Sequence, residues 1–136
     1  MKILVIDDDP AMTDLLKLIL VSSNAEVFTA NSGNEGLQKI KDLCPSIVIL
    51  DLMMPDMDGW QITSEIRKFS SVPILILSVI DNPGLVARAL DAGADDYLIK
   101  PAARNMLIAH INNLTRRRTA IEENSTPLKL KAESFF

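Results

Sequence analysis

Cysteine, histidine and aromatic residues are scarce in this sequence of 136 residues, which holds one cysteine, one histidine and 4% aromatic residues. The single cysteine, Cys44, excludes an internal disulfide. Its position beside Pro45, just before an apolar run, predicts a half-buried free thiol in a reducing compartment. The single histidine, His110, leaves no serine–histidine or cysteine–histidine pair among the candidate site residues, which argues against acyl transfer.

Long apolar runs and glycine-rich loops are also missing. No stretch approaches the roughly 18 apolar residues of a membrane span, and one lysine before a short apolar run that ends in acids is not a signal peptide. The five glycines form neither a phosphate loop ending in GK[ST] nor a GxGxxG motif. The net charge of −4 argues against a protein that binds nucleic acid over its whole surface. We therefore expect a cytoplasmic protein without a membrane partner.

Short apolar runs of β type alternate with longer segments whose apolar residues recur at helical spacing. The first, third and fourth runs are apolar almost throughout, which is typical of parallel strands covered on both faces. Five such units in a chain of single-domain size predict an α/β fold with a doubly wound, five-stranded parallel sheet. The expected strands are 3–6, 25–29, 47–50, 74–77 and 95–99, and the expected helices include 12–20, 37–43, 60–66, 85–90 and 106–114.

Helix-capping residues mark several boundaries. Asp9, which precedes a proline, is typical of an N-cap with proline in the first turn. Asn31 or Ser32 can cap the second helix, and Asp58 can cap the third. The sequence DAG at 91–93 predicts a helix that ends on a glycine.

Polar residues follow four of the five expected strands at their carboxyl ends, where ligands bind in open α/β sheets. We call this edge of the sheet the rim, and its residues are Asp7, Asp8, Asp9, Asp51, Ser78 and Lys100. The second strand contributes no obvious residue. His110 belongs to the last helix and is expected at the surface, far from the rim.

The charges of the rim residues predict a metal site and phosphoryl transfer. Asp7, Asp8 and Asp51 would repel one another strongly if they converged, and Lys100 offsets only one charge. Carboxylates, a backbone carbonyl and waters are the ligands that Mg²⁺ prefers. A metal and a lysine can neutralise phosphoryl oxygens, the hydroxyl of Ser78 can donate to another, and a carboxylate can be the nucleophile. Without a nucleotide motif, the phosphate donor must be small or be brought by another protein.

Four motifs carry a resemblance to a known family: ILVIDDDP, IVILDLMMPDMDG, ILILS and GADDYLIKP, in this order. Over residues 1–118 the sequence resembles the receiver domain of bacterial two-component response regulators. The resemblance implies a flavodoxin-like sheet with strand order 2-1-3-4-5. It also implies a phosphoacceptor that assists its own phosphorylation and dephosphorylation, rather than an enzyme, with a sensor histidine kinase as its partner.

The resemblance assigns roles to individual residues. Asp51 matches the phosphoacceptor, Asp8 the acid that binds Mg²⁺ directly, and Asp7 the acid that usually binds it through water. Met53 matches the position whose backbone carbonyl is a metal ligand. Lys100 matches the phosphate-binding lysine, and the peptide bond after it is usually cis in the family.

The resemblance also assigns a switch. Ser78 matches the hydroxyl that moves toward the phosphoryl group, and Tyr97 the aromatic residue that turns inward with it. Val79 stands where alanine is most frequent, and its extra methyl groups are expected to crowd the route of Tyr97. Asp9 separates from its acidic neighbours and is expected to cap a helix.

Met53 and Ile80 occupy two positions that influence how quickly the phosphoryl group is lost to water in this family. Both side chains are apolar, and neither can orient a water for hydrolysis. We therefore expect a long-lived phospho-form.

The segment ALDAGADDYL and the helix after it resemble receivers of the winged-helix transcription-factor subfamily, which dimerise through helix 4, strand 5 and helix 5. Asp95, Asp96 and Arg117 match its charged positions, whereas Met106 replaces an acid and His110 replaces an arginine. A homodimer on this face is therefore expected to depend more on apolar contact.

The composition changes after Arg118, and residues 119–136 read as a linker or tail. The final NSTPLKLKAESFF fits the first strand of a truncated effector domain, through which DNA would be bound. It equally fits the tail of a stand-alone, single-domain regulator. The arginines at 116–118 are better explained as cations at a helix C-terminus than as a contact with nucleic acid.

Two rival functions are weighed against a phosphorylation-activated switch that controls transcription. A metal-dependent phosphatase with an aspartyl nucleophile usually has a second acid two residues later, where Met53 lies here. A degenerate receiver that only binds partners would lack phosphorylation residues, and all of them are present. The sequence therefore favours the switch.

Overall fold

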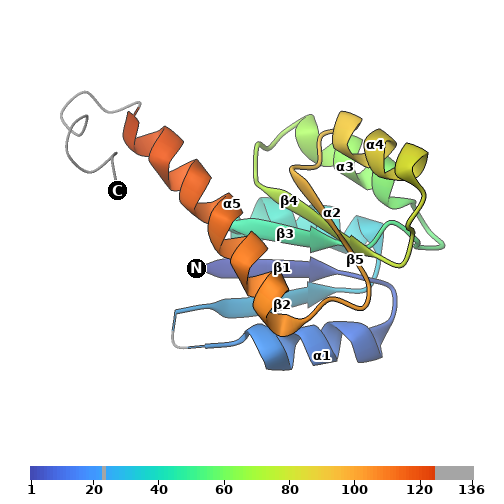
Figure 1. The fold of residues 1–136 in the computed structure, drawn as a ribbon, viewed down its shortest axis with the longest axis horizontal. Helices are drawn as coiled ribbons and strands as arrows, with labels where there is room; N and C mark the ends of the chain where they lie inside the picture. The colour runs from blue at the N-terminus through green and yellow to red at the C-terminus, as the bar shows by residue number, and fades with distance from the viewer. Residues whose placement is uncertain (23, 125–136) are drawn as a thin grey trace.

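The computed structural model describes residues 1–22 and 24–124, with side chains as far as Arg117. Within these residues, five parallel strands form one sheet in the order β2-β1-β3-β4-β5, which confirms the expected fold (Figure 1). The elements are β1 (Lys2–Ile6), α1 (Pro10–Leu20), β2 (Glu26–Ala30), α2 (Gly33–Leu43), β3 (Ile47–Leu50), α3 (Gly59–Arg67), β4 (Ile74–Ser78), α4 (Pro83–Asp91), β5 (Asp96–Ile99) and α5 (Arg104–Asn124).

Helices cover both faces of the sheet. Successive residues of a strand point to opposite faces, so strands that are apolar throughout present apolar side chains on both. The even-numbered apolar residues of β1, β3 and β4 pack with α2, α3 and α4, and the odd-numbered ones pack with α1 and α5. The sheet therefore separates two apolar cores, which explains why these strands are apolar at nearly every position. In the described part of the chain, no helix has the length and apolar character needed to cross a membrane.

Local capping agrees with the sequence. Asp9 accepts a backbone N–H in the first turn of α1 at 3.0 Å, so this acid starts a helix as expected. Ser32, not Asn31, caps α2, and Asp58 caps α3. Gly93, just beyond α4, has a φ of 121°, a conformation that glycine adopts without strain.

Three features differ from the sequence-based expectations. Cys44 is exposed, so the half-buried thiol was a wrong prediction: this residue ends α2 with a φ of 48°, and the buried apolar run begins only after it. β2 lies one residue later than predicted. α5 is longer than the predicted helix 106–114 and ends at Asn124, while the domain boundary after residue 118 stays a prediction. The predicted effector strand or tail in residues 125–136 lies outside the described residues.

Candidate functional site

Four side chains meet at the rim, from the carboxyl ends of β1, β3, β4 and β5. The Nζ of Lys100 lies 2.8 Å from Oδ2 of Asp7 and 3.6 Å from Oδ2 of Asp51. Ser78, the last residue of β4, is fully buried beside them. The parallel strands end nearly in line, so residues far apart in the sequence reach one edge of the sheet. The predicted convergence is confirmed for these residues.

Asp51 is a buried carboxyl group with a small opening to solvent. The residue is 9% exposed, and its Oδ1 accepts the backbone N–H of Met53 at 3.3 Å. Burial raises the pKa of Asp51 above its ordinary value, and the charge of Asp7 adds to the increase. Lys100, Met53 and Ser78 act in the opposite direction, so this carboxylate depends on its neighbours to hold its charge.

Lys100 supplies the positive charge between the two acids. Burial by itself lowers the pKa of Lys100, but the hydrogen bond to Asp7 and the charges of Asp51 and Asp7 outweigh it and raise the pKa. The ammonium group therefore remains charged and offsets one of the acids. The peptide bond from Lys100 to Pro101 is cis, as the family resemblance implies.

Asp7, Asp8 and Asp51 form an acidic group whose carboxylate oxygens lie within 4.8 Å of one another. Asp7 is buried and Asp8 is exposed, so the group has a protein side and a solvent side. An all-oxygen set with room for waters fits a hard divalent cation such as Mg²⁺. The backbone carbonyl of Met53 stays a predicted ligand. Asp9 turns away to cap α1, so the acidic triplet divides into two metal candidates and one cap.

Ser78 and Tyr97 bind the same residue of the loop after β4. The hydroxyl oxygen of Ser78 accepts the backbone N–H of Ile80 at 3.4 Å, and the hydroxyl of Tyr97 donates to the carbonyl of Ile80 at 2.7 Å. Burial raises the pKa of Tyr97, which therefore remains protonated and able to donate. Val79 is 61% exposed, and its crowding of Tyr97 stays a prediction.

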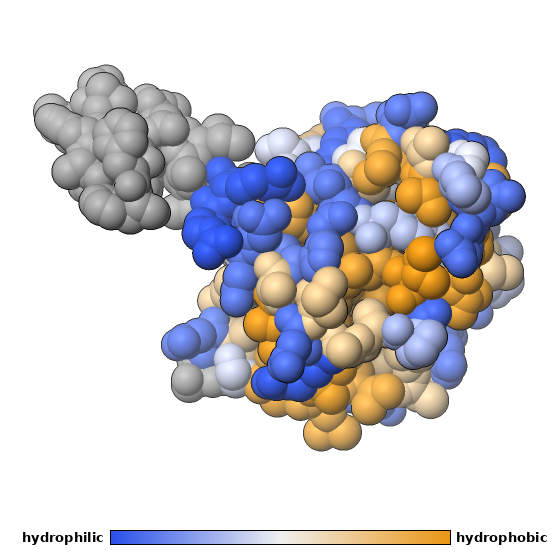
Figure 2. Space-filling view, in the orientation of Figure 1, coloured by the Kyte–Doolittle hydropathy of each residue, from blue (hydrophilic) through white to orange (hydrophobic). Residues whose placement is uncertain are grey.

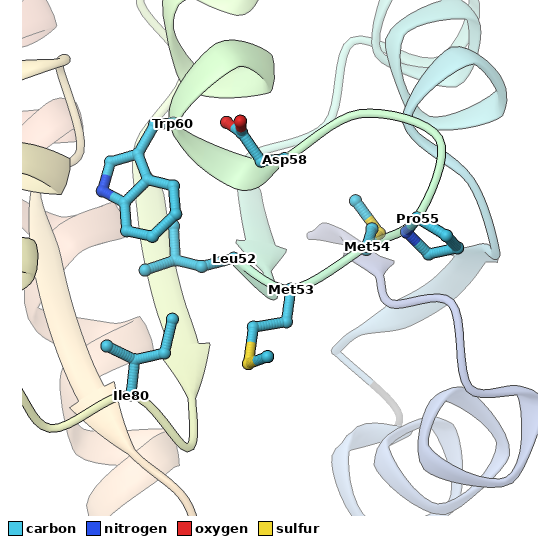
Figure 3. Close-up of a pocket in the computed structure, with 7 residues that line it drawn as sticks. All are labelled: Leu52, Met53, Met54, Pro55, Asp58, Trp60 and Ile80. Carbon is cyan, nitrogen blue, oxygen red and sulfur yellow. The ribbon is translucent and has the colours of Figure 1, made fainter.

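A pocket of about 490 Å³ is lined by Leu52 and Met53, the two residues that follow Asp51 in the chain. Met53, from the loop after β3, and Ile80, from the loop after β4, face the same hollow, which Trp60 of α3 also lines (Figure 3). The indole N–H of Trp60 donates to the carbonyl of Leu85 at 3.2 Å, which joins α3 to α4. Apart from Asp58, the residues that line this pocket are apolar or aromatic.

Comparison with known families identifies the family to which this fold belongs. The model of the response regulator receiver domain matches residues 3–112. The chain belongs to this family. Receiver domains are signalling domains, and the matched range includes all the rim residues.

Similar proteins agree with the receiver assignment. The probable transcriptional regulator ycf27 of Porphyra purpurea is 39% identical over 90% of this chain and 51% of its own length. The transcriptional regulatory protein KdpE of Mycobacterium tuberculosis is 35% identical over 98% of this chain and 58% of its own length. This receiver thus spans about half the length of the curated relatives it matches. Their names agree with the resemblance to the winged-helix transcription-factor subfamily.

Solved structures match the receiver along most of its length. A two-component response regulator from Clostridium difficile superposes with a TM-score of 0.83 at 31% identity, over 87% of this chain and 98% of that one. The BeF3-activated N-terminal receiver domain of Klebsiella pneumoniae RstA gives a TM-score of 0.81 at 28% identity, over 85% of this chain and 99% of that one.

The sequence analysis missed a contribution from β2. Asn31, directly after this strand, donates its side-chain amide to the backbone carbonyl of Asp7 at 2.8 Å. Asp56 accepts the backbone N–H of Gly33 with both carboxylate oxygens, at 2.9 and 3.2 Å, and so supports the start of α2. The second strand, for which the sequence indicated no obvious residue, is thus followed by Asn31, which contacts the backbone of Asp7.

Both acids at the start of β5 have partners within the receiver. Asp95 pairs with Arg67 of α3 at 2.9 Å. Asp96 contacts Nδ1 of His110 on α5, whose side chain is only 27% exposed. His110 is far from the rim as expected, but it is a half-buried partner of an acid and not a plain surface residue.

Proposed function

We propose that this receiver is a phosphorylation-activated switch in the cytoplasm, in which Asp51 accepts a phosphoryl group from a sensor histidine kinase. The observation that carries the proposal is the position of Asp51: a nearly buried carboxylate, 3.6 Å from the ammonium of Lys100 and within the acidic group of Asp7 and Asp8. A carboxylate in such a place can attack phosphorus, and the surrounding charges can stabilise the transferred group.

The proposed transfer of the phosphoryl group from the kinase to Asp51 needs no further reactant. An oxygen of Asp51 forms a bond to phosphorus, while the bond from phosphorus to the imidazole nitrogen of the kinase breaks and its electron pair stays on that nitrogen. Mg²⁺, held by Asp7, Asp8, Asp51 and the carbonyl of Met53, would supply charge neutralisation for the phosphoryl oxygens. Lys100 binds one of these oxygens, since its ammonium already lies beside Asp51.

Ser78 and Tyr97 convert phosphorylation into a change of shape in this proposal. The hydroxyl of Ser78 donates to the phosphoryl group and so releases the N–H of Ile80, which it now accepts at 3.4 Å. Ile80 also accepts from Tyr97, so the loop and the ring respond together. A population shift requires a contact that differs between the two states, and the contact from Ser78 to the phosphoryl group provides it.

The output surface is proposed to be the face formed by α4, β5 and α5, through which two receivers would form a homodimer. Leu90, Ile99 and Met106 are 42%, 42% and 52% exposed on these three elements. Figure 2 shows apolar surface on the side of the molecule that faces the viewer. Since Asp96 and His110 pair within one protomer, apolar contact is the better source of dimer affinity. DNA would be bound through an effector domain outside the described residues.

Intact mass after incubation with acetyl phosphate and Mg²⁺ tests the proposal. We expect one phosphoryl adduct, which is lost in Asp51→Asn and when the metal is chelated. Asp8→Ala and Asp9→Ala are a matched pair in the acidic triplet. The first should lose most of the adduct. The second should keep it and lose only about 1 kcal/mol of stability with its helix cap.

Two results would replace the switch by another function. Turnover of a small phosphate ester without a stable adduct would indicate a metal-dependent aspartyl-phosphate phosphatase. Failure of the wild-type receiver to accept phosphate would indicate a binding module. A sizing column run on the same samples tests whether the adduct promotes dimerisation.

A further inference from the structure

Asn31 joins β2 to the loop that carries the acids of β1. Its side-chain amide donates to the carbonyl of Asp7 at 2.8 Å and to the hydroxyl of Thr13 at 3.1 Å. Thr13 is 1% exposed and donates in turn to the carbonyl of Pro10 at 3.1 Å. The amide of Asn31 therefore ties both ends of the segment from Asp7 to Pro10 to the end of β2.

The other hydrogen bonds of Asp7 hold its N–H and its carboxylate, and Asn31 holds its backbone carbonyl. The N–H of Asp7 donates to the carbonyl of Ala30 at 3.1 Å. Its two carboxylate oxygens accept from the N–H of Asp9 at 3.0 Å and from Lys100 at 2.8 Å. The carbonyl of Asp7 is part of the peptide group that joins Asp7 to Asp8. The hydrogen bond from Asn31 therefore fixes the orientation of this peptide group.

Asn31 is itself held in place. Its backbone N–H donates to the carboxylate of Glu35 at 2.6 Å, and Glu35 pairs with Lys39 at 3.4 Å. Although the residue as a whole is exposed, its amide group reaches inward to Thr13. Water can replace the lost donor if the side chain is shortened, so the effect on stability should be small. A water does not hold a peptide in one orientation, so the effect on a metal site should be larger.

We propose that Asn31 is a positioning residue that orients Asp7 and Asp8 and thereby sets the affinity of the site for Mg²⁺. The inference rests on the proposed function, because it concerns the same metal. It differs from that proposal in naming a residue directly after β2 that would contact neither the phosphoryl group nor the metal.

Calorimetric titration of the full chain with Mg²⁺ tests the inference. We expect Asn31→Ala to raise the Kd for Mg²⁺ about tenfold, the lower end of what loss of a support to a metal ligand costs. Ser32→Ala is the matched control, because it removes the adjacent cap of α2 without touching Asp7, and its Kd should stay within about twofold of wild type. The phosphorylation rate of Asn31→Ala should recover at saturating Mg²⁺, and its melting temperature should fall no more than that of Ser32→Ala.

The outcomes separate the inference from the proposed function. The inference is overturned if the Kd of Asn31→Ala for Mg²⁺ equals that of wild type, or if Ser32→Ala raises the Kd by the same factor. Neither result bears on the phosphorylation of the wild type. A wild type that binds Mg²⁺ but accepts no phosphoryl group overturns the proposed function, while the two Kd values still decide the role of Asn31. Absence of Mg²⁺ binding by the wild type overturns the inference.

Discussion

The two loops beside Asp51 are held in different ways. In the loop after β1, all the polar atoms of Asp7 have partners: its N–H, its carbonyl and both carboxylate oxygens are bonded within 2.8 to 3.1 Å. In the loop after β4, Ile80 is held by a contact of 3.4 Å to Ser78 and by one bond of 2.7 Å from Tyr97.

The difference separates a fixed part of the rim, the loop after β1 with Asp7, from an adjustable part, the loop after β4 with Ile80. A contact of 3.4 Å lies at the long end of hydrogen-bond distances and costs little to exchange for another acceptor. The shorter bonds around Asp7 keep the acids in place whether or not the loop after β4 moves. The loops after β1 and β4 are thus on opposite sides of Asp51, because β3 lies between β1 and β4, and each loop can be perturbed by itself.

The largest effect is expected from Lys100→Met, which removes the cation between Asp7 and Asp51 on the fixed side. Two acids then face each other with less compensation, and the free energy of unfolding should fall by about 3 kcal/mol. Urea unfolding in chelator measures this loss, and added Mg²⁺ should reverse part of it. Lys68→Met is the control: Lys68 pairs with Glu65 at the surface, and its loss should cost less than about 0.5 kcal/mol. Equal losses would contradict the role given to Lys100.

Gly59→Ala is expected to disturb, by steric overlap, the backbone of Asp51 and Leu52, which lies between the fixed and the adjustable part. A Cβ at this position would lie 2.6 Å from Cα of Leu52 and 2.9 Å from the carbonyl oxygen of Asp51, so the backbone around Asp51 must shift. We expect a loss of about 2 kcal/mol in urea unfolding and slower phosphorylation. Gly84→Ala, on the adjustable side, meets only Oδ1 of Asn82 at 3.2 Å and should change stability by less than about 0.5 kcal/mol. A reversed order of the two variants would contradict the comparison.

Ile80→Glu should shorten the life of the phospho-form, because a carboxylate in the pocket beside Asp51 can orient a water that the apolar wild-type side chain cannot. We expect the half-life to fall about tenfold, below the usual range of general-base assistance. Decay of the adduct, followed by intact mass, measures it. Val79→Glu places the same charge one residue away on an exposed side chain and should have little effect. A wild-type half-life of seconds would show that the apolar pair with Met53 gives no protection.

The smallest effect on stability is expected from Tyr97→Phe, which removes the bond to the carbonyl of Ile80. The cost should be about 1 kcal/mol or less, since the ring keeps its packing. Phosphorylation of Asp51 should proceed at the wild-type rate, while the response on the sizing column should weaken. An unchanged response would show that the loop after β4 acts without the ring.

Much of the site follows from the sequence because its residues come directly after apolar runs. Asp51 and Lys100 each follow such a run, Ser78 ends one, and parallel strands bring these positions to one edge. The division of the acidic triplet was equally local, since Asp9 stands before a proline as an N-cap does. Such features depend on neighbours in the chain, and the structure confirms the meeting of these strand ends and the cap by Asp9, while the metal site stays a prediction.

The residues that were missed depend on contacts between distant segments. Asn31 was considered only as a cap, and its bond to Asp7 spans 24 residues. His110 was taken for a surface residue, because nothing in α5 indicates that Asp96 lies beside it. The exposure of Cys44 follows from a left-handed residue at the end of α2, which its apolar surroundings in the sequence do not indicate.

The alternation of odd and even residues in β1, β3 and β4 has a mechanical consequence. The side chains that hold α4 and those that hold α1 and α5 belong to separate cores, and the sheet lies between them. Displacement of α4 would therefore repack one core without pressing on the side chains of the other. A partner that rests on α1 could remain in place while the opposite face of the sheet changes its shape.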